Sequence, residues 1–419
     1  MKSVINYLFS IVGNRFFRNV SILVGGTAFA QILAIAVLPI LTKLYTPEDF
    51  GVLALFGAVL TILVSVACFR FEIAIPISKD DKTAVELLLL ALLGVLITAV
   101  VVSLVIIVLF PQINRLTNSS LGNYLWLLPV GVFLSGLYSA FQYWMIRERK
   151  FSIVSKTRIA QSISGASIQV GLGLLGVAPV GLLMGQIFQS GAGALRLAVS
   201  FFRCRSLRNV KLSGLKNTFK QYERFPKFST WEALANSGSI HLPIIIIGAS
   251  VAGAEAGFLM LAMRLLSAPL GLIGGAVGQV YLVEAAGKLH EGELRRFTLR
   301  TVYSLIKIGT LPLVIAGLAA PLLVSLVFGE EWARVGVMIS WMVPWFLIQF
   351  ITSPISMSLH ITGNQKTALA LQLFGLFFRV SAVLIASFCL SDWVAEVYSI
   401  SGLFFYGIYF LVVLRFLGK

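Results

Sequence analysis

Charged side chains are scarce in this sequence. Only 12% of its 419 residues are charged and 58% are hydrophobic. The sequence has 17 acidic residues and 33 lysines and arginines. A soluble protein carries about twice that charged fraction, so the composition excludes an ordinary soluble fold. The mean hydropathy of +0.93 points to a membrane protein for the same reason.

Cysteines are few, and no phosphate-binding loop is recognisable. Cys68, Cys204 and Cys389 lie far apart and match no metal-ligand spacing. We expect no disulfide, because the topology below places Cys389 on the opposite side of the membrane from the other two. The longest polar stretch, residues 203–227, has no nucleotide-binding glycine loop, which excludes an ATP motor within this chain. We expect no cofactor and no bound metal.

Long apolar runs are what the sequence has in their place. The first run, residues 21–41, is too long for a signal-peptide core and lacks a small-residue cleavage site, so we expect a retained helix. A helix needs about 20 apolar residues to cross a bilayer, and twelve segments qualify. They are 20–41, 51–69, 85–110, 124–146, 159–177, 180–202, 229–249, 256–283, 301–327, 335–360, 368–389 and 392–414. The predicted fold is therefore an all-α membrane protein of about 12 transmembrane helices.

The distribution of lysine and arginine predicts the orientation. With the N-terminus in the cytoplasm, 26 of the 33 basic residues fall in cytoplasmic segments, 3 fall on the other side and 4 lie within spans. Positive residues concentrate in cytoplasmic loops, so we expect an inner-membrane protein with both termini in the cytoplasm. The net charge of +16 then orients helices in a bilayer, and nucleic acid is not an expected partner.

The two halves of the chain resemble each other weakly. Pro39 and the run 48–55 match Pro243 and the run 254–261 in composition and order. Six spans per half give a parallel repeat, which is typical of transporters with a substrate path between the halves. We expect an N-terminal bundle at 1–202, a basic cytoplasmic linker at 203–228 and a C-terminal bundle at 229–419. Chance similarity among apolar helices is the alternative explanation.

Four cationic residues fall inside the predicted spans. Arg196 and Lys307 lie near cytoplasmic ends, where long side chains can reach the headgroups. Arg264 and Arg379 lie deeper, where a charge costs several kcal/mol. A wet central cavity best explains these two, with a structural ion pair as the alternative.

Polar side chains recur at helical spacing on several spans and form narrow faces that must point inward. They include Gln142, Gln186, Gln189, Glu232, Asn236, Gln349, Ser353 and His360. Amides and hydroxyls suit sugar hydroxyls, and arginine suits phosphate. The faces therefore predict a hydrophilic lumen, although interhelical hydrogen bonds would explain some of them equally well.

Several ordered motifs resemble one family. They are the run 39–51 with Gln31 before it, the runs 70–76 and 224–229, the run 256–269 around Arg264, and the run 328–332. This series is similar to the oligosaccharide flippases of O-antigen and capsule synthesis (Wzx type), within the multidrug/oligosaccharidyl-lipid/polysaccharide exporter superfamily. The resemblance extends over nearly the whole chain.

The resemblance implies two six-helix bundles around a central cavity. It also implies transport of undecaprenyl-pyrophosphate-linked repeat units from the cytoplasmic to the periplasmic leaflet, for lipopolysaccharide O-antigen synthesis. Arg264 matches a basic residue linked to the pyrophosphate, while Gln31 stands where related lipid II flippases place arginine. Glu232 and Glu255 are candidates for proton or sodium coupling. The polysaccharide polymerase and chain-length proteins are candidate partners.

Other functions remain as alternatives. A drug/cation antiporter of the same superfamily would need buried carboxylates, yet the deep ionisable groups here are arginines. A membrane polymerase or ligase would need a large periplasmic loop, and no predicted outer loop exceeds about a dozen residues. We therefore expect that the protein is not an enzyme. A purely structural scaffold would leave Arg264 and Arg379 unexplained.

The orientation is directly testable. Single cysteines replacing Ser213 and Asn118 in a cysteine-free background should react from opposite sides of the membrane, because the charge distribution places these residues on opposite faces. The measurement is labelling of intact spheroplasts with an impermeant maleimide. Labelling of Ser213→Cys from outside would reverse the predicted orientation.

Overall fold

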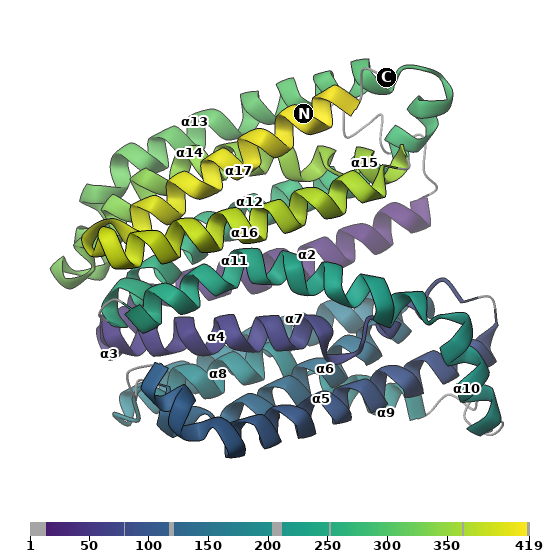
Figure 1. The fold of residues 1–419 in the computed structure, drawn as a ribbon, viewed down its shortest axis with the longest axis horizontal. Coiled ribbons are helices and arrows are strands. Elements are labelled where there is room, and N and C mark those ends of the chain that lie inside the picture. Colours follow the sequence, from purple (N-terminus) through teal and green to yellow (C-terminus); the bar gives the residue numbers. More distant parts are fainter. Residues whose placement is uncertain are drawn as a thin grey trace.

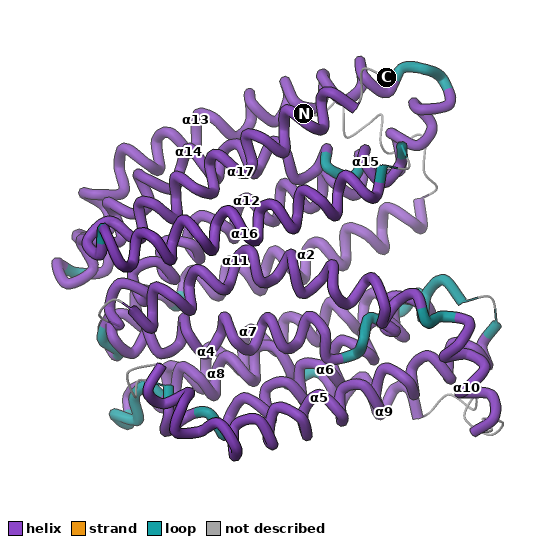
Figure 2. The backbone as a smooth tube through the Cα atoms, viewed as in Figure 1, coloured by secondary structure: helices purple, strands orange, loops and turns teal. Residues whose placement is uncertain are grey.

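The fold is helical throughout the part of the chain that the computed structural model describes. These residues are 14–78, 80–116, 121–202, 212–250, 253–362 and 364–416. Figure 2 shows long helices joined by short loops, with no strand among the described residues. The protein is a multi-pass, all-α membrane protein, as the apolar runs predict.

Eight helices form the first half of the chain, which we call the N-lobe. They are α2 (Asn14–Ala36), α3 (Leu38–Leu44), α4 (Pro47–Ala67), α5 (Asp81–Leu116), α6 (Leu127–Arg147), α7 (Phe151–Leu174), α8 (Val180–Gly191) and α9 (Ala194–Phe202). The start of α4 is fixed by its sequence. Thr46 caps the helix, accepting from the Asp49 amide at 3.3 Å while Asp49 accepts from the Thr46 amide at 3.0 Å.

The second half, the C-lobe, follows a short amphipathic helix α10 (Leu212–Gln221). Its helices are α11 (Thr230–Ser250), α12 (Gly253–His290), α13 (Leu294–Phe328), α14 (Ala333–Ile355), α15 (Ser358–Ile361), α16 (Gln365–Cys389) and α17 (Val394–Phe416). Figure 1 shows the two lobes as two groups of roughly parallel helices. The start of α2 and the end of α17 lie at the same end of the molecule, together with α10.

Each expected span coincides with one helix or with two consecutive helices. Among the described residues, nine helical segments are long and apolar enough to cross a membrane by composition alone. The segments that do not qualify are α6, α7 and the α8–α9 pair. The last is interrupted after Gly191 into pieces of 12 and 9 residues. The count of twelve spans therefore stays a prediction.

The same helix pairings recur in both lobes. In the N-lobe α5 packs on α6, α2 on α7, and α6 on α8 and α9. In the C-lobe the corresponding pairs are α13 on α14, α11 on α16, and α14 on α17. This repetition fits the parallel repeat seen in the sequence. The domain boundaries remain a prediction, and residues 203–211 of the linker lie outside the described part.

The lobes meet at the end that contains residues 45–50, which we call the outer end because the charge distribution predicts that it is periplasmic. Here α4 packs against both α11 and α12. The contact is very close, because a Cβ on Gly257 would overlap the Pro47 carbonyl oxygen. The Phe50 ring also packs edge-on against Trp332 of the C-lobe, with 4.9 Å between centroids. The outer end is therefore closed.

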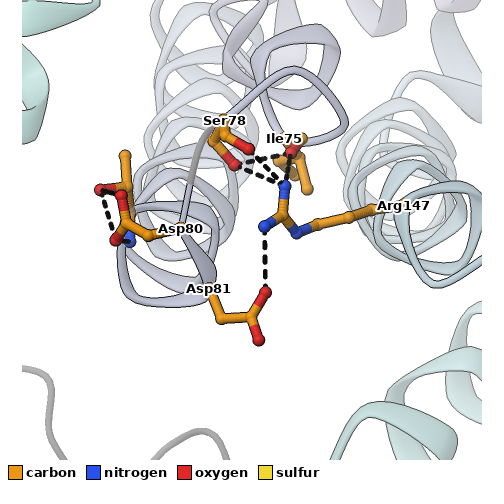
Figure 3. Close-up of polar contacts among 6 residues, drawn as sticks. Ile75, Ser78, Asp80, Asp81 and Arg147 are labelled. Atoms are coloured by element: carbon orange, nitrogen blue, oxygen red, sulfur yellow. Dashed lines mark hydrogen bonds and ion pairs between the residues drawn. The ribbon is translucent and has the colours of Figure 1, made fainter.

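A polar clamp organises the opposite, inner end of the N-lobe (Figure 3). Arg147, at the end of α6, donates to the carbonyls of Ile75 and Ser78 at 3.2 and 2.7 Å, and pairs with Asp81 at 2.9 Å. Asp80 accepts from the backbone and hydroxyl of Thr83, and these bonds lower the pKa of its carboxyl. The clamp fixes the connection between α4 and α5.

The inner end also anchors the interlobe segment to the N-lobe. Thr218 of α10 donates to the buried Glu86 carboxylate of α5, and Phe219 packs on Phe71 with 5.7 Å between ring centroids.

Cys68 and Cys389 are both free, while Cys204 lies outside the described residues. No pairing involving the two described cysteines is present.

The outer closure yields a prediction. Gly257→Ala should destabilise the closed outer end by about 1–3 kcal/mol, because its methyl group cannot fit against the Pro47 carbonyl. The readout is labelling of a single cysteine replacing Leu55, which is 1% exposed and contacts the position of a Cβ on Gly248. Labelling from the outer side should rise markedly in the Gly257→Ala background.

Gly275 provides the matched control. It lies on the same helix, and a Cβ there would meet nothing within 4 Å. Gly275→Ala should leave the labelling of the Leu55→Cys reporter unchanged. Equal labelling of the two alanine variants would show that the contact between Gly257 and Pro47 does not hold the outer end closed.

Candidate functional site

Arg264 lies on α12, where this helix passes the N-lobe. Its Nη2 donates to Oε1 of Gln186 on α8 at 2.9 Å, so the bond joins the two lobes. The side chain is half-buried, and it makes no ion pair with a carboxylate of the described residues. A guanidinium has five N–H donors, and one bond to a neutral amide leaves most of this hydrogen-bonding capacity available. The site can therefore take an anion.

Gln31 belongs to α2 and lies next to α12, the helix that carries Arg264. Its Nε2 is 3.9 Å from the position that a Cβ on Gly271 would occupy, and its buried Oε1 has no hydrogen-bond partner. Gln349 on α14 likewise has a buried Oε1 without a partner. Gln31 therefore has an unused hydrogen-bond acceptor close to the lobe interface, and Gln349 has one within the C-lobe.

The remaining polar residues do not form one cluster. Asn236 and Ser353 are exposed, while Glu232 and Gln142 are half-buried. Gln189 faces α7 of its own lobe, where its Cβ would be 2.9 Å from a Cβ on Gly165. The side chain of His360 lies outside the described residues. The structure thus brings Arg264 and Gln186 together and leaves the rest of the predicted set distributed over both lobes.

Arg379 does not face a wet cavity, so that expectation is wrong for this structure. The side chain is 0% exposed and lies against the rings of Trp345 and Tyr398, each centroid 4.6 Å from Cζ, while the two rings pack edge to face on each other. Its Nε, Nη1 and Nη2 have no hydrogen-bond partner among the described residues. Two electron-rich ring faces replace water around the cation. The sequence places these rings on α14 and α17, and no spacing signal connects them to α16.

Glu255 has a partner at the outer end. Arg334 binds Glu255 at 3.0 Å and Glu396 at 2.7 Å, and the Glu396 side chain is only 3% exposed. This network links the starts of α12, α14 and α17. The sequence did not predict this network, because Arg334 lies in a short predicted outer segment, Glu396 lies in the predicted span 392–414, and no spacing connects the two. A carboxylate held by arginine is a poor candidate for free cation binding.

The burial of Arg379 yields a prediction. Arg379→Met should leave the melting temperature unchanged or higher, because it removes a buried charge without hydrogen bonds and keeps most of the volume. Arg379→Lys should destabilise the protein by about 1–3 kcal/mol, because the compact, strongly hydrated ammonium packs less well against the two rings than the planar guanidinium does. Thermal unfolding of the purified protein in detergent measures both.

The opposite order of stabilities would contradict this interpretation. If Arg379→Met unfolds at a lower temperature than Arg379→Lys, the charge itself stabilises the C-lobe. Lys307→Met serves as the control, since Lys307 is exposed and its replacement should not change the melting temperature.

Comparison with solved structures finds the same fold in several transporters. The lipid II flippase MurJ, in an inward closed conformation, matches with a TM-score of 0.71 and 14% identity, covering 93% of this chain and 86% of that one. An inward-facing multidrug resistance MATE family transporter of the MOP superfamily gives 0.63 and 16%, covering 94% of each chain. A MOP superfamily transporter from Pyrococcus furiosus gives 0.54 and 16%, covering 96% and 95%.

At these identities the structural matches show the fold alone. An outward-facing conformation of a MATE family transporter gives a lower TM-score, 0.58, than the inward-facing conformation above.

The comparison with curated protein sequences finds no match. The family model for polysaccharide biosynthesis proteins matches residues 40–336, which is most of the chain. The chain therefore belongs to the polysaccharide biosynthesis protein family, and it has the fold of the MOP superfamily transporters.

Proposed function

We propose that this protein is a flippase that moves undecaprenyl-pyrophosphate-linked oligosaccharide repeat units from the cytoplasmic to the periplasmic leaflet of the inner membrane. The product would supply O-antigen or another surface polysaccharide. Family membership supports a role in polysaccharide synthesis. The fold, which is similar to that of a lipid II flippase, supports transport of a lipid-linked substrate.

The contact between Arg264 and Gln186 carries this proposal. A pyrophosphate is a dense anion, and arginine holds phosphate by paired hydrogen bonds. Arg264 lies where the lobes meet and its one polar partner is a neutral amide. A substrate phosphate would supply the counter-charge that no described carboxylate supplies, and Gln186 would release the guanidinium at little electrostatic cost.

The closed outer end supports a mechanism by alternating access. With Phe50 and Gly257 closing the outer end, the state described here would load substrate from the cytoplasmic leaflet. Release would require separation of α4 from α11 and α12. Proton or sodium coupling stays a proposal, with Glu232 and Glu255 as its candidate residues. The polysaccharide polymerase and chain-length proteins stay proposed partners.

A drug/cation antiporter is the second candidate, because the MATE transporters share the fold. A cationic drug needs a carboxylate near the lobe interface. In the described residues, Glu255 and Glu396 are both bound to Arg334. The half-buried Glu232 on α11 and Glu284 on α12 are the remaining candidates among the described residues of these two helices. The unpaired cation Arg264 favours an anionic substrate.

Arg264 provides the test. Arg264→Ala should lower transport by at least about tenfold, since a charge-assisted hydrogen bond contributes about 1.5–3 kcal/mol. Arg264→Lys should retain part of the transport, because the point charge remains, and Arg264→Glu should retain none. The measurement is leaflet-resolved transport of a defined lipid-linked oligosaccharide in proteoliposomes, per unit of inserted protein.

Gln186→Ala is the matched control. It removes the amide that Arg264 contacts but keeps the cation, so transport should fall much less than in Arg264→Ala. Near-normal specific transport by Arg264→Ala would show that this residue only packs the interface. Uptake of a cationic dye by the same proteoliposomes, without lipid transport, would favour the antiporter.

A further inference from the structure

Arg158 on α7 has, like Arg264, a neutral partner on another helix. Its Nη1 donates to Oγ1 of Thr27 on α2 at 2.5 Å, and the side chain is half-buried. Arg158 makes no ion pair with a carboxylate of the described residues. A guanidinium has five N–H donors, and a single hydroxyl oxygen accepts from few of them. Arg158 can therefore bind an anion.

The carboxylates at the inner end of the N-lobe have other cationic partners. Glu72 is buried and paired with Arg70 at 3.5 Å, and Arg70 is the charged group that acts on it. Glu148, in the turn that precedes α7, is paired with Lys150 at 3.6 Å. The positive charge of Arg158 is thus not balanced by these two acidic side chains.

The face of α12 that carries Arg264 has only small residues directly inward of it. Ala268, Gly271 and Gly275 follow on this face, and both glycines lie within about 20° of Arg264 around the helix axis. Glu284, further along α12, lies on the opposite face. No side chain larger than a methyl group therefore projects toward the N-lobe from this part of α12.

The space beside this face of α12 widens from the outer end to the inner end. At the outer end, a Cβ on Gly257 would overlap the Pro47 carbonyl oxygen. Further in, a Cβ on Gly271 would lie 3.9 Å from Nε2 of Gln31, and a Cβ on Gly275 would meet nothing within 4 Å. The lobes therefore separate inward of the level at which Gln31 faces α12.

Arg158 borders this opening near the level of the inner headgroups. Thr27 precedes Gln31 by one turn on the same face of α2, about 6 Å further in, and Gln31 faces α12 about 10 Å inward of Arg264. The two arginines are thus about 16 Å apart along the membrane normal. The predicted span 159–177 begins directly after Arg158, which places this residue at the inner boundary of the hydrocarbon layer and Arg264 near the midplane of a core of about 30 Å.

We propose that Arg158 is the loading site for the substrate's pyrophosphate, which it holds at the level of the inner leaflet before the anion passes along the small-residue face of α12 to Arg264. This inference rests on the proposed function. Arginine binds phosphate oxygens through paired hydrogen bonds. Thr27 is neutral, so release of the guanidinium leaves no carboxylate unpaired. The glycines of α12 leave room for the anion between the lobes.

The test measures initial rates of leaflet-resolved transport in proteoliposomes, per unit of inserted protein, over a range of mole fractions of a defined lipid-linked oligosaccharide. Arg158→Ala should raise the half-saturating mole fraction by at least about tenfold, because a charge-assisted hydrogen bond to the substrate is lost. The maximal rate should change little, because the lost contact acts in loading. Arg158→Lys should restore part of the affinity.

Lys156→Ala is the matched control. Lys156 is exposed, lies on the opposite face of α7 and carries the same charge at a similar depth. Its replacement should leave the half-saturating mole fraction unchanged. Equal increases in Lys156→Ala and Arg158→Ala would overturn the proposal in favour of general charge attraction. A lower maximal rate of Arg158→Ala at unchanged half-saturation would instead show a packing role.

Gly275→Trp tests the path between the two arginines. Its ring would fill the space beside α12, so transport should fall by at least about tenfold while Arg158-dependent binding of farnesyl pyrophosphate in detergent is retained. Gly287→Trp is the control, because a Cβ on Gly287 also meets nothing within 4 Å but lies about 120° away around the helix. Normal transport by Gly275→Trp would exclude this path.

Failure of this inference is distinguishable from failure of the proposed function. Near-normal transport by Arg264→Ala contradicts the proposed function, whatever Arg158→Ala does. Loss of transport in Arg264→Ala together with an unchanged half-saturating mole fraction in Arg158→Ala contradicts the loading site alone.

Discussion

A cation within a hydrocarbon layer must find electron-rich partners, and three arginines of this protein meet that need in different ways. Arg334 binds two carboxylates at the outer end. Arg379 lies against two aromatic rings and has no hydrogen bond among the described residues. Arg264 has one neutral amide partner, from the opposite lobe. Arg334 and Arg379 find their partners within the C-lobe, whereas the partner of Arg264 depends on how the lobes are arranged.

This difference connects charge to conformational change. Separation of the lobes would leave the Arg334 network intact, because α12, α14 and α17 all belong to the C-lobe. The same movement would break the bond between Arg264 and Gln186 and separate Phe50 from Trp332. The energetic cost of opening therefore falls on apolar contacts and one hydrogen bond to an amide. A bound anion at Arg264 would change that cost directly, because it replaces the amide as partner.

The sequence was sufficient to predict much of the fold. Apolar runs of about 20 residues gave the positions of the spans, because a bilayer imposes length and hydropathy on each one. The break between Gly191 and Ala194 was not predicted. Helical periodicity predicted an inward-facing Gln186 and the depth of Arg264 within a span predicted the same for that residue, and the structure joins the two. The partners of Arg379 could not be predicted, because periodicity shows which face of a helix is polar but not which rings on other helices meet it.

The environment of Arg379 bears on why a charge is retained at that position. Two ring faces offset part of the desolvation cost, yet all three guanidinium nitrogens lack acceptors, so an apolar residue of similar volume would pack there at no greater cost. Stability alone therefore does not explain the arginine. Its field acts on the surrounding C-lobe, where His241 and Tyr406 are close enough to interact electrostatically with it. Arg264 and Arg379 thus place two positive charges inside the helical bundle, neither in an ion pair among the described residues, and each charge disfavours a cation beside it.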